Sequence, residues 1–173
     1  YEFGDGFTAA VGYTGAGSSS SGLLTKESND TFGGQLAYTA DSYGASLTYA
    51  NVEGALNTDR NYFGLNGYWT PSETGFIPSI SAGYEVGEAQ GLADTSQWFV
   101  GLQWDEAGPG TFGVALGTDG AFAEDATEYM IYEAFYSYPV NDGMTITPLV
   151  YVRENDATKE DQTGIMVKTS FSF

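Results

Sequence analysis

The sequence predicts an all-β fold, an antiparallel up-and-down transmembrane β-barrel, and three observations carry this prediction. About ten segments alternate apolar with small or polar residues, the period of two that a strand imposes. The connections between these segments are alternately short and long. The last segment ends on an aromatic residue, Phe173. We therefore expect residues 1–173 to form one β-barrel domain.

The predicted strands follow one another along the whole chain, and each is bounded by Gly, Pro, Asn, Asp or Ser. Their ranges are 6–13, 31–39, 43–51, 61–70, 77–86, 96–105, 111–118, 128–138, 144–153 and 162–173. No stretch approaches the roughly 18 uninterrupted apolar residues that a membrane helix needs. Strands escape this requirement because only alternate residues of a barrel strand meet lipid.

Each predicted strand has one apolar face without charged residues. The last strand shows this most fully, since its apolar face would carry Thr163, Ile165, Val167, Thr169, Phe171 and Phe173. The opposite face would carry Gln162, Met166, Lys168, Ser170 and Ser172. Contact with hydrocarbon explains the missing charge, because a Lys or Arg at mid-membrane costs about 2–4 kcal/mol.

Aromatic residues recur six positions apart on the apolar faces. The pairs are Phe7 and Tyr13, Phe32 and Tyr38, Tyr43 and Tyr49, Phe63 and Trp69, Trp98 and Trp104, and Tyr132 and Tyr138. Aromatic rings prefer the two interfaces of a membrane, which predicts aromatic girdles at the strand ends. On the short-turn side the predicted girdle residues are Tyr38, Tyr43, Trp69, Trp104, Tyr138 and Phe173.

The short and long connections predict which end of the barrel faces outward. Short connections lie at 40–42, 71–75, 105–110 and 139–143, and longer ones lie at 15–30, 52–60, 87–95, 119–127 and 154–161. Bacterial barrels place short turns in the periplasm and long loops outside. We expect both chain ends on the periplasmic side.

Composition excludes several classes of function. Asp and Glu outnumber Lys and Arg by 23 to 5, and the net charge of −18 would repel nucleic acid. The chain has no Cys and no His, so zinc ligands and the Ser-His and Cys-His nucleophile pairs are missing. We expect no cofactor, no metal and no enzymatic activity.

Two alternatives compete with the barrel pore. A soluble β-sandwich or ligand-binding barrel would show the same alternation with its apolar face turned inward. Its other face would have to suit water, yet most opposite positions are Gly, Ala, Ser, Thr or Asn and the charge lies in the connections. A small outer-membrane barrel enzyme is the second alternative, which the lack of His disfavours.

The segment 133–152, EAFYSYPVNDGMTITPLVYV, and the ending GIMVKTSFSF resemble cyanobacterial outer-membrane porins related to the carbohydrate-selective (OprB-like) family. In that family an aromatic strand leads through a short turn into an Ile-Thr-Pro strand. Tyr138 to Asp142 and Ile146-Thr147-Pro148 occupy those places here. The resemblance is clear over the last quarter of the chain and elsewhere rests on strand rhythm.

The resemblance implies a larger porin barrel of about sixteen strands, often a homotrimer, preceded by an S-layer-homology domain. The chain would then be the C-terminal portion of such a porin. A terminal aromatic residue such as Phe173 is also the signal that barrel-assembly machinery recognises. The implied function is passive diffusion of small hydrophilic solutes, carbohydrates or inorganic ions through the outer membrane.

The inward positions of the predicted strands are the candidate pore lining. Many are small, such as Thr8, Gly33, Ser46, Gly113 and Ala115, which leaves room for water. Charged or amide side chains among the inward positions and at the long-loop ends are the site candidates: Glu85, Gln103, Glu133, Lys168, Arg60 and Arg153. Glu85 and Glu133 predict a preference for cations, and the basic residues predict local ion pairs or a weak anion site.

Overall fold

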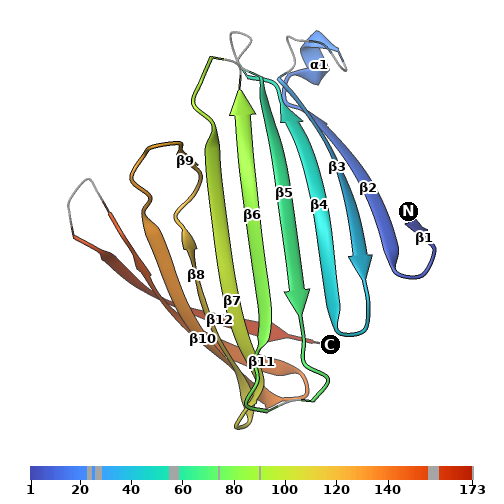
Figure 1. Ribbon diagram of the computed structural model, residues 1–173. Helices are drawn as coiled ribbons and strands as arrows, with labels where there is room; N and C mark the ends of the chain where they lie inside the picture. Colours follow the sequence, from blue (N-terminus) through green and yellow to red (C-terminus); the bar gives the residue numbers. More distant parts are fainter. Residues whose placement is uncertain are drawn as a thin grey trace. The chain divides into compact units, whose positions relative to one another are not determined.

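The chain is an antiparallel β-sheet throughout most of the computed structural model, which describes residues 1–22, 25, 29–54, 59–73, 75–89, 91–155 and 160–172 (Figure 1). The strands are β1 (Glu2–Phe3), β2 (Phe7–Gly15), β3 (Asp30–Thr39), β4 (Tyr43–Val52), β5 (Arg60–Trp69), β6 (Ser79–Ala89), β7 (Thr95–Ala107), β8 (Gly110–Thr118), β9 (Phe122–Ala123), β10 (Met130–Asn141), β11 (Met144–Arg153) and β12 (Gln162–Phe171). One four-residue helix, α1, covers Ser18–Ser21.

The strands form one up-and-down sheet, which confirms the predicted fold class. Their hydrogen-bonded order is the order of the sequence from β1 to β8, followed by β10, β11 and β12. β9 leaves this path and pairs with β7, where Ser96 lies opposite Phe122. Each predicted strand corresponds to one of the long strands. The two-residue strands β1 and β9 and helix α1 were not predicted, because elements this short show no measurable period.

No helix in the part of the chain that the structure describes is long and apolar enough to cross a membrane.

Two short connections are tighter than the sequence suggests. β10 continues through Pro139 and Val140 to Asn141, so the hairpin to β11 is only Asp142-Gly143, and Asn141 Oδ1 accepts a hydrogen bond of 2.9 Å from the Gly143 amide. Pro139 lacks an N–H, and it fits in the strand because its register with β11 shifts between Pro139 and Asn141. β7 likewise extends to Ala107, and Gly108, with φ of 72°, makes the turn.

The chain divides into two compact units. The first comprises Tyr1–Gly67, Gly83–Gln97 and Ala121–Ala126, and the second comprises Tyr68–Ala82, Trp98–Gly120 and Thr127–Phe173.

In the first unit, strand register places the apolar residues of β2, β3 and β4 on one face. Ala9 lies opposite Leu36, and Leu36 lies opposite Leu47. The residues between them in sequence form the other face, where Ala37 lies opposite Ser46 and Thr8. In β4 the apolar positions from Tyr43 to Tyr49 are exposed and the alternate positions are half-buried or buried. The apolar face is therefore the more exposed of the two in this strand.

In the second unit, the same alternation runs through β8, β10, β11 and β12. Val114 lies opposite Ala134, Ala134 opposite Val150, and Val150 opposite Ile165. Ile165 is 80% exposed. Among the described residues no hydrophobic side chain is buried, whereas a soluble sandwich needs a core of buried hydrophobic side chains. An apolar face this exposed requires an apolar solvent or partner.

Candidate functional site

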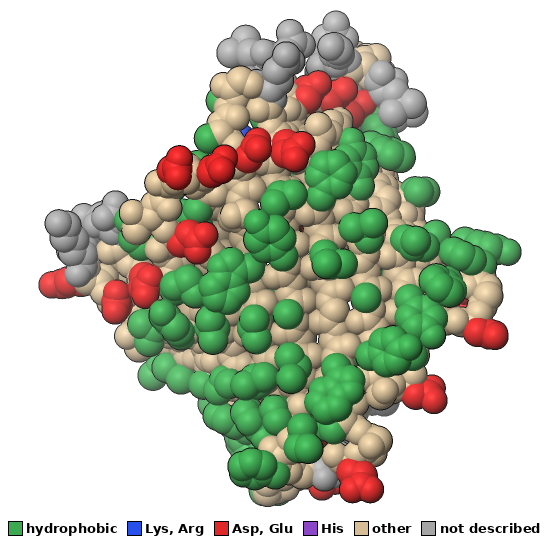
Figure 2. All heavy atoms as spheres, viewed as in Figure 1, with side chains coloured by type: hydrophobic (Ala, Val, Ile, Leu, Met, Phe, Trp, Pro, Cys, Tyr) green, Lys and Arg blue, Asp and Glu red, His purple; other side chains and the backbone are tan. Residues whose placement is uncertain are grey.

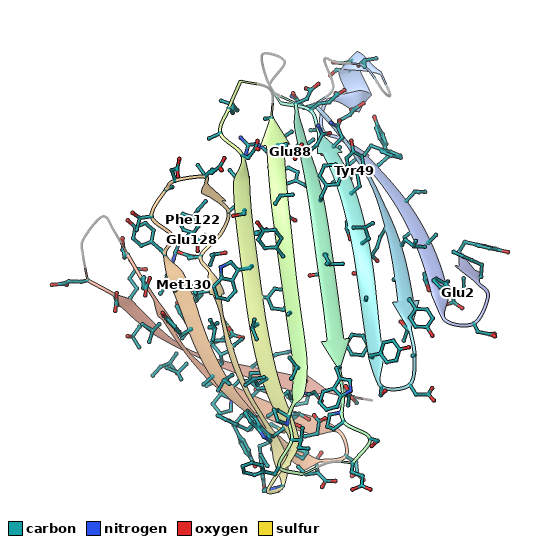
Figure 3. The ribbon with its side chains drawn as sticks, in the orientation of Figure 1. Glu2, Tyr49, Glu88, Phe122, Glu128 and Met130 are labelled. Atoms are coloured by element: carbon teal, nitrogen blue, oxygen red, sulfur yellow. The ribbon has the colours of Figure 1, made fainter. Side chains whose placement is uncertain are left out.

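Figure 2 shows how residue types are distributed over one face of the molecule. Hydrophobic side chains gather over the middle of the strands, and Asp and Glu side chains lie toward the strand ends. Figure 3 places Tyr49 and Glu88 of the first unit near the ends of β4 and β6 that lead into the long connections. The charge is thus kept away from the centre of this face, as hydrocarbon contact requires.

Several predicted girdle residues contact other aromatic rings in the structure. The Tyr38 ring centroid lies 4.8 Å from that of Phe7 and 5.9 Å from that of Tyr43. In the second unit the Trp104 ring stacks on Phe112 at 5.8 Å, and Trp104 Nε1 donates a hydrogen bond of 3.0 Å to the Phe76 carbonyl.

Among the described residues, the girdle candidates Trp69 and Tyr138 make no contact with another aromatic ring. Trp69 and Tyr138 are both exposed at the short-turn ends of their strands. Phe173 lies outside the described residues.

The polar face of the first unit combines small residues with two of the predicted charged residues. Glu85 is half-buried, and its Oε1 accepts a hydrogen bond of 2.8 Å from Gln97 Nε2. Its Oε2 lies 3.9 Å from where a Cβ of Gly64 would be, a point equally close to Thr48. Arg60 Nη1 donates a bond of 3.2 Å to Thr95 Oγ1, at the long-loop end. Glu85 thus stands beside an open glycine position on the face predicted to line a pore.

The predicted basic residues of the second unit lie apart from each other. Arg153 forms an ion pair with Asp119, and its side chain remains 50% exposed. Lys168 is exposed on β12 and lies opposite Thr147 of β11. Among the described residues the structure therefore assembles no cluster of basic side chains here.

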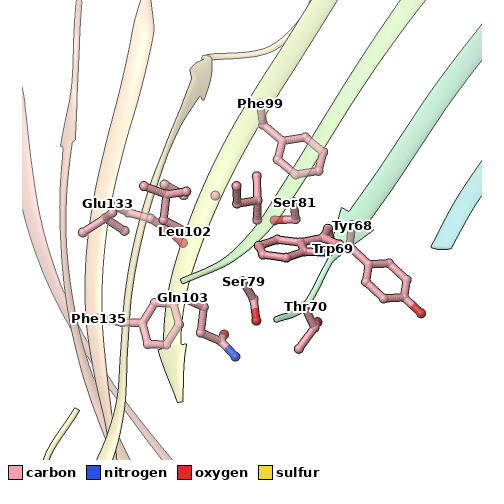
Figure 4. A pocket seen from close by; sticks show the side chains of 14 residues that line it. Tyr68, Trp69, Thr70, Ser79, Ser81, Phe99, Leu102, Gln103, Glu133 and Phe135 are labelled. Atoms are coloured by element: carbon pink, nitrogen blue, oxygen red, sulfur yellow. The ribbon is translucent and has the colours of Figure 1, made fainter. Parts of the chain in front are cut away.

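A hollow of about 410 Å³ opens on the polar face of the second unit (Figure 4). Two of the predicted residues, Gln103 and Glu133, line it together. Its other walls carry serine and threonine hydroxyls and the rings of Phe99 and Phe135. The structure thus brings one predicted carboxylate and one predicted amide to a single polar recess.

The polar face of the second unit also carries bulky side chains, which the small residues at the inward positions of the sequence did not predict. Phe135 covers Gly113 of the neighbouring strand, since a Cβ at Gly113 would lie 2.3 Å from the Phe135 ring. Tyr151 covers Gly164 in the same way, again at 2.3 Å. A large aromatic residue opposite a glycine is visible in the sequence only after the register is known. The glycines make space for rings in this unit, rather than widening the lumen everywhere.

Within the described residues, no three His, Cys, Asp or Glu side chains are grouped so that they could hold a metal ion.

An antiparallel sheet with one exposed, uncharged apolar face and one small, polar face defines the class of transmembrane β-strand proteins. A family model described as Gram-negative porin matches residues 1–162. The chain therefore belongs to the Gram-negative porin family, whose members reside in the outer membrane, contact its lipid and let small solutes pass. No curated protein matches the chain.

Proposed function

We propose that this chain forms the wall of a pore through which small hydrophilic solutes and inorganic ions diffuse passively, with a preference for cations. The observation that carries the proposal is the difference between the two faces. The apolar faces of β2, β3 and β4 hold no charged side chain between their flanking aromatic residues, and the apolar face of β12 holds none from Thr163 to Phe171. The polar faces hold hydroxyls, glycines and a few carboxylates, which suit contact with water.

The preference for cations follows from the sign of the charge on the polar face. Glu85 keeps one hydrogen bond and an open side toward Gly64, and Glu133 lines the hollow of the second unit. Arg153 is paired with Asp119, which lowers its effect on passing anions. The net charge of −18 adds an attraction for cations near the pore mouth.

Reversal potentials test the preference directly. The purified porin is placed in a planar bilayer between unequal concentrations of KCl, and the potential at zero current is measured. We expect a reversal potential displaced toward the potassium equilibrium potential, and a smaller displacement in the variant carrying both Glu85→Gln and Glu133→Gln. A displacement toward the chloride equilibrium potential would contradict the proposed cation preference.

The resemblance of the Tyr138 to Pro148 hairpin to carbohydrate-selective porins of cyanobacteria extends the proposal to sugars among the permeating solutes. Assembly as a homotrimer and recognition of Phe173 by the barrel-assembly machinery belong to the same proposal. Membership of the porin family supports a channel over the barrel enzyme considered from the sequence.

A further inference from the structure

The hollow in the second unit owes its depth to a row of residues that runs across neighbouring strands. Gly101 of β7 lies opposite Ala115 of β8, and Ala115 lies opposite Glu133 of β10. Ser81 Oγ lies only 2.8 Å from where a Cβ of Gly101 would be, so the serine occupies the space beside the glycine. Gly101 and Ala115 form a low floor, because they carry the smallest side chains. The Glu133 side chain rises beside this floor.

The walls of the hollow combine one negative charge with aromatic surface. Glu133 is the one carboxylate, and no Lys or Arg accompanies it among the described lining residues. Among the described residues the Glu133 side chain also has no hydrogen bond or ion pair. The rings of Tyr68, Phe99 and Phe135 line the same space, and the first two residues are 44% and 43% exposed (Figure 4). The recess therefore offers an unpaired anion next to apolar and π-rich surfaces.

This combination selects among the solutes that a porin meets. A small inorganic cation keeps its water or seeks several oxygen ligands, and it gains little from the rings. A neutral solute donates hydroxyl hydrogen bonds to Glu133 but carries no charge for the carboxylate to attract. An organic ammonium ion uses both features, because its charge is attracted to the carboxylate and to the ring faces while its carbon groups cover apolar surface. A volume of about 410 Å³ lies within the range of small-molecule sites.

We propose that this hollow is a binding site for small organic cations, amines or quaternary ammonium ions, on the wall of the pore. The cationic nitrogen lies against Glu133, and the carbon groups lie against Phe135 and Phe99. Bound solute narrows the path past the wall and lowers the current carried by other ions. The inference rests on the proposed pore function, since it requires that solutes reach the polar face.

Block of the potassium current by tetraethylammonium tests the proposal. The full porin in a planar bilayer is titrated with tetraethylammonium chloride, and glucose is titrated separately as a neutral solute. We expect a saturable decrease of the potassium current with tetraethylammonium and no saturable decrease with glucose. Glu133→Gln should raise the half-blocking concentration about tenfold, the effect of losing roughly 1.4 kcal/mol of charge attraction.

A matched control separates the site from the overall charge of the protein. Glu88→Gln removes the same charge from β6, at a position whose parity places it on the other face from Glu85, and should leave the half-blocking concentration unchanged. Phe99→Leu keeps an apolar side chain but removes the ring, and should weaken block without removing Glu133. Folding of each variant is judged by heat-dependent migration on gels. If Glu133→Gln fails to fold, Phe99→Leu still tests the site.

The outcomes distinguish failure of this inference from failure of the proposed function. A wild-type protein that inserts and carries no current refutes the pore itself. A conducting protein whose block by tetraethylammonium is not saturable, or is equal in Glu133→Gln and wild type, refutes the organic-cation site alone. Equal, saturable block by glucose also refutes it, because the charge would then play no part.

Discussion

Replacing Leu47 by Arg tests which face of the sheet meets lipid. Leu47 lies on β4 opposite Leu36, four residues after Tyr43 at the short-turn end, and is 56% exposed. Four residues rise about 13 Å along a strand, or about 10 Å along the membrane normal at a tilt of about 40°. The apolar band is about 25 Å tall, so Leu47 lies close to its middle.

The expected effect follows from that depth. Arg at the bilayer midplane destabilises a barrel by about 2–4 kcal/mol, which shifts the folding equilibrium about 30- to 700-fold toward the unfolded protein. Ser46→Arg is the matched control, because Ser46 precedes Leu47 directly and lies opposite Ala37 on the polar face. A side chain on a wet face keeps its hydration, and we expect Ser46→Arg to destabilise by less than about 1 kcal/mol.

Both variants are measured by reversible unfolding in guanidinium chloride from phospholipid vesicles, with tryptophan fluorescence as the signal. The difference in unfolding free energy between the two variants is the quantity of interest, since it cancels effects common to strand β4. A larger effect of Ser46→Arg would show that the polar face meets lipid. Equal destabilisation by the two substitutions would also refute the assignment of faces, because only one face of a barrel strand meets lipid.

Two further variants test contacts within the sheet. Gly113→Ala should destabilise the protein by about 1–3 kcal/mol, because the new Cβ would meet the Phe135 ring and force it to shift. Gly12→Ala is the control and should be neutral in the same unfolding assay, because no heavy atom lies within 4 Å of its Cβ position. A neutral Gly113→Ala would contradict the close packing of Phe135. Arg153→Ala removes an exposed ion pair with Asp119 and should change the unfolding free energy by less than about 1 kcal/mol. This difference should vanish in high salt. A larger loss of stability that does not depend on salt would mean that the pair is shielded from solvent.

The faces of the strands were predictable from sequence because the pleat of a strand sends successive side chains to opposite sides. This local rule alone assigns Leu47 to one face and Ser46 to the other, and the observed register agrees. The same rule assigns Glu133 and Lys168 to the polar face. It also explains where the sequence prediction was less complete. β1 and β9 are too short for a period to be read, and three residues of the predicted turn at 139–143 continue β10.

The sequence by itself therefore determined the strand segments, their two faces and the absence of charge from the apolar one. Only the tertiary structure decided which residues of different strands meet. Glu133 joins Ser81 and Phe99 in one hollow, Phe135 covers Gly113, and Arg153 reaches Asp119, 34 positions earlier in the chain. These neighbours depend on the cross-strand register. Turn lengths and strand irregularities, such as the register shift near Pro139, together determine that register. A period of two excludes only register shifts by an odd number of residues, because the pattern repeats identically after every second residue.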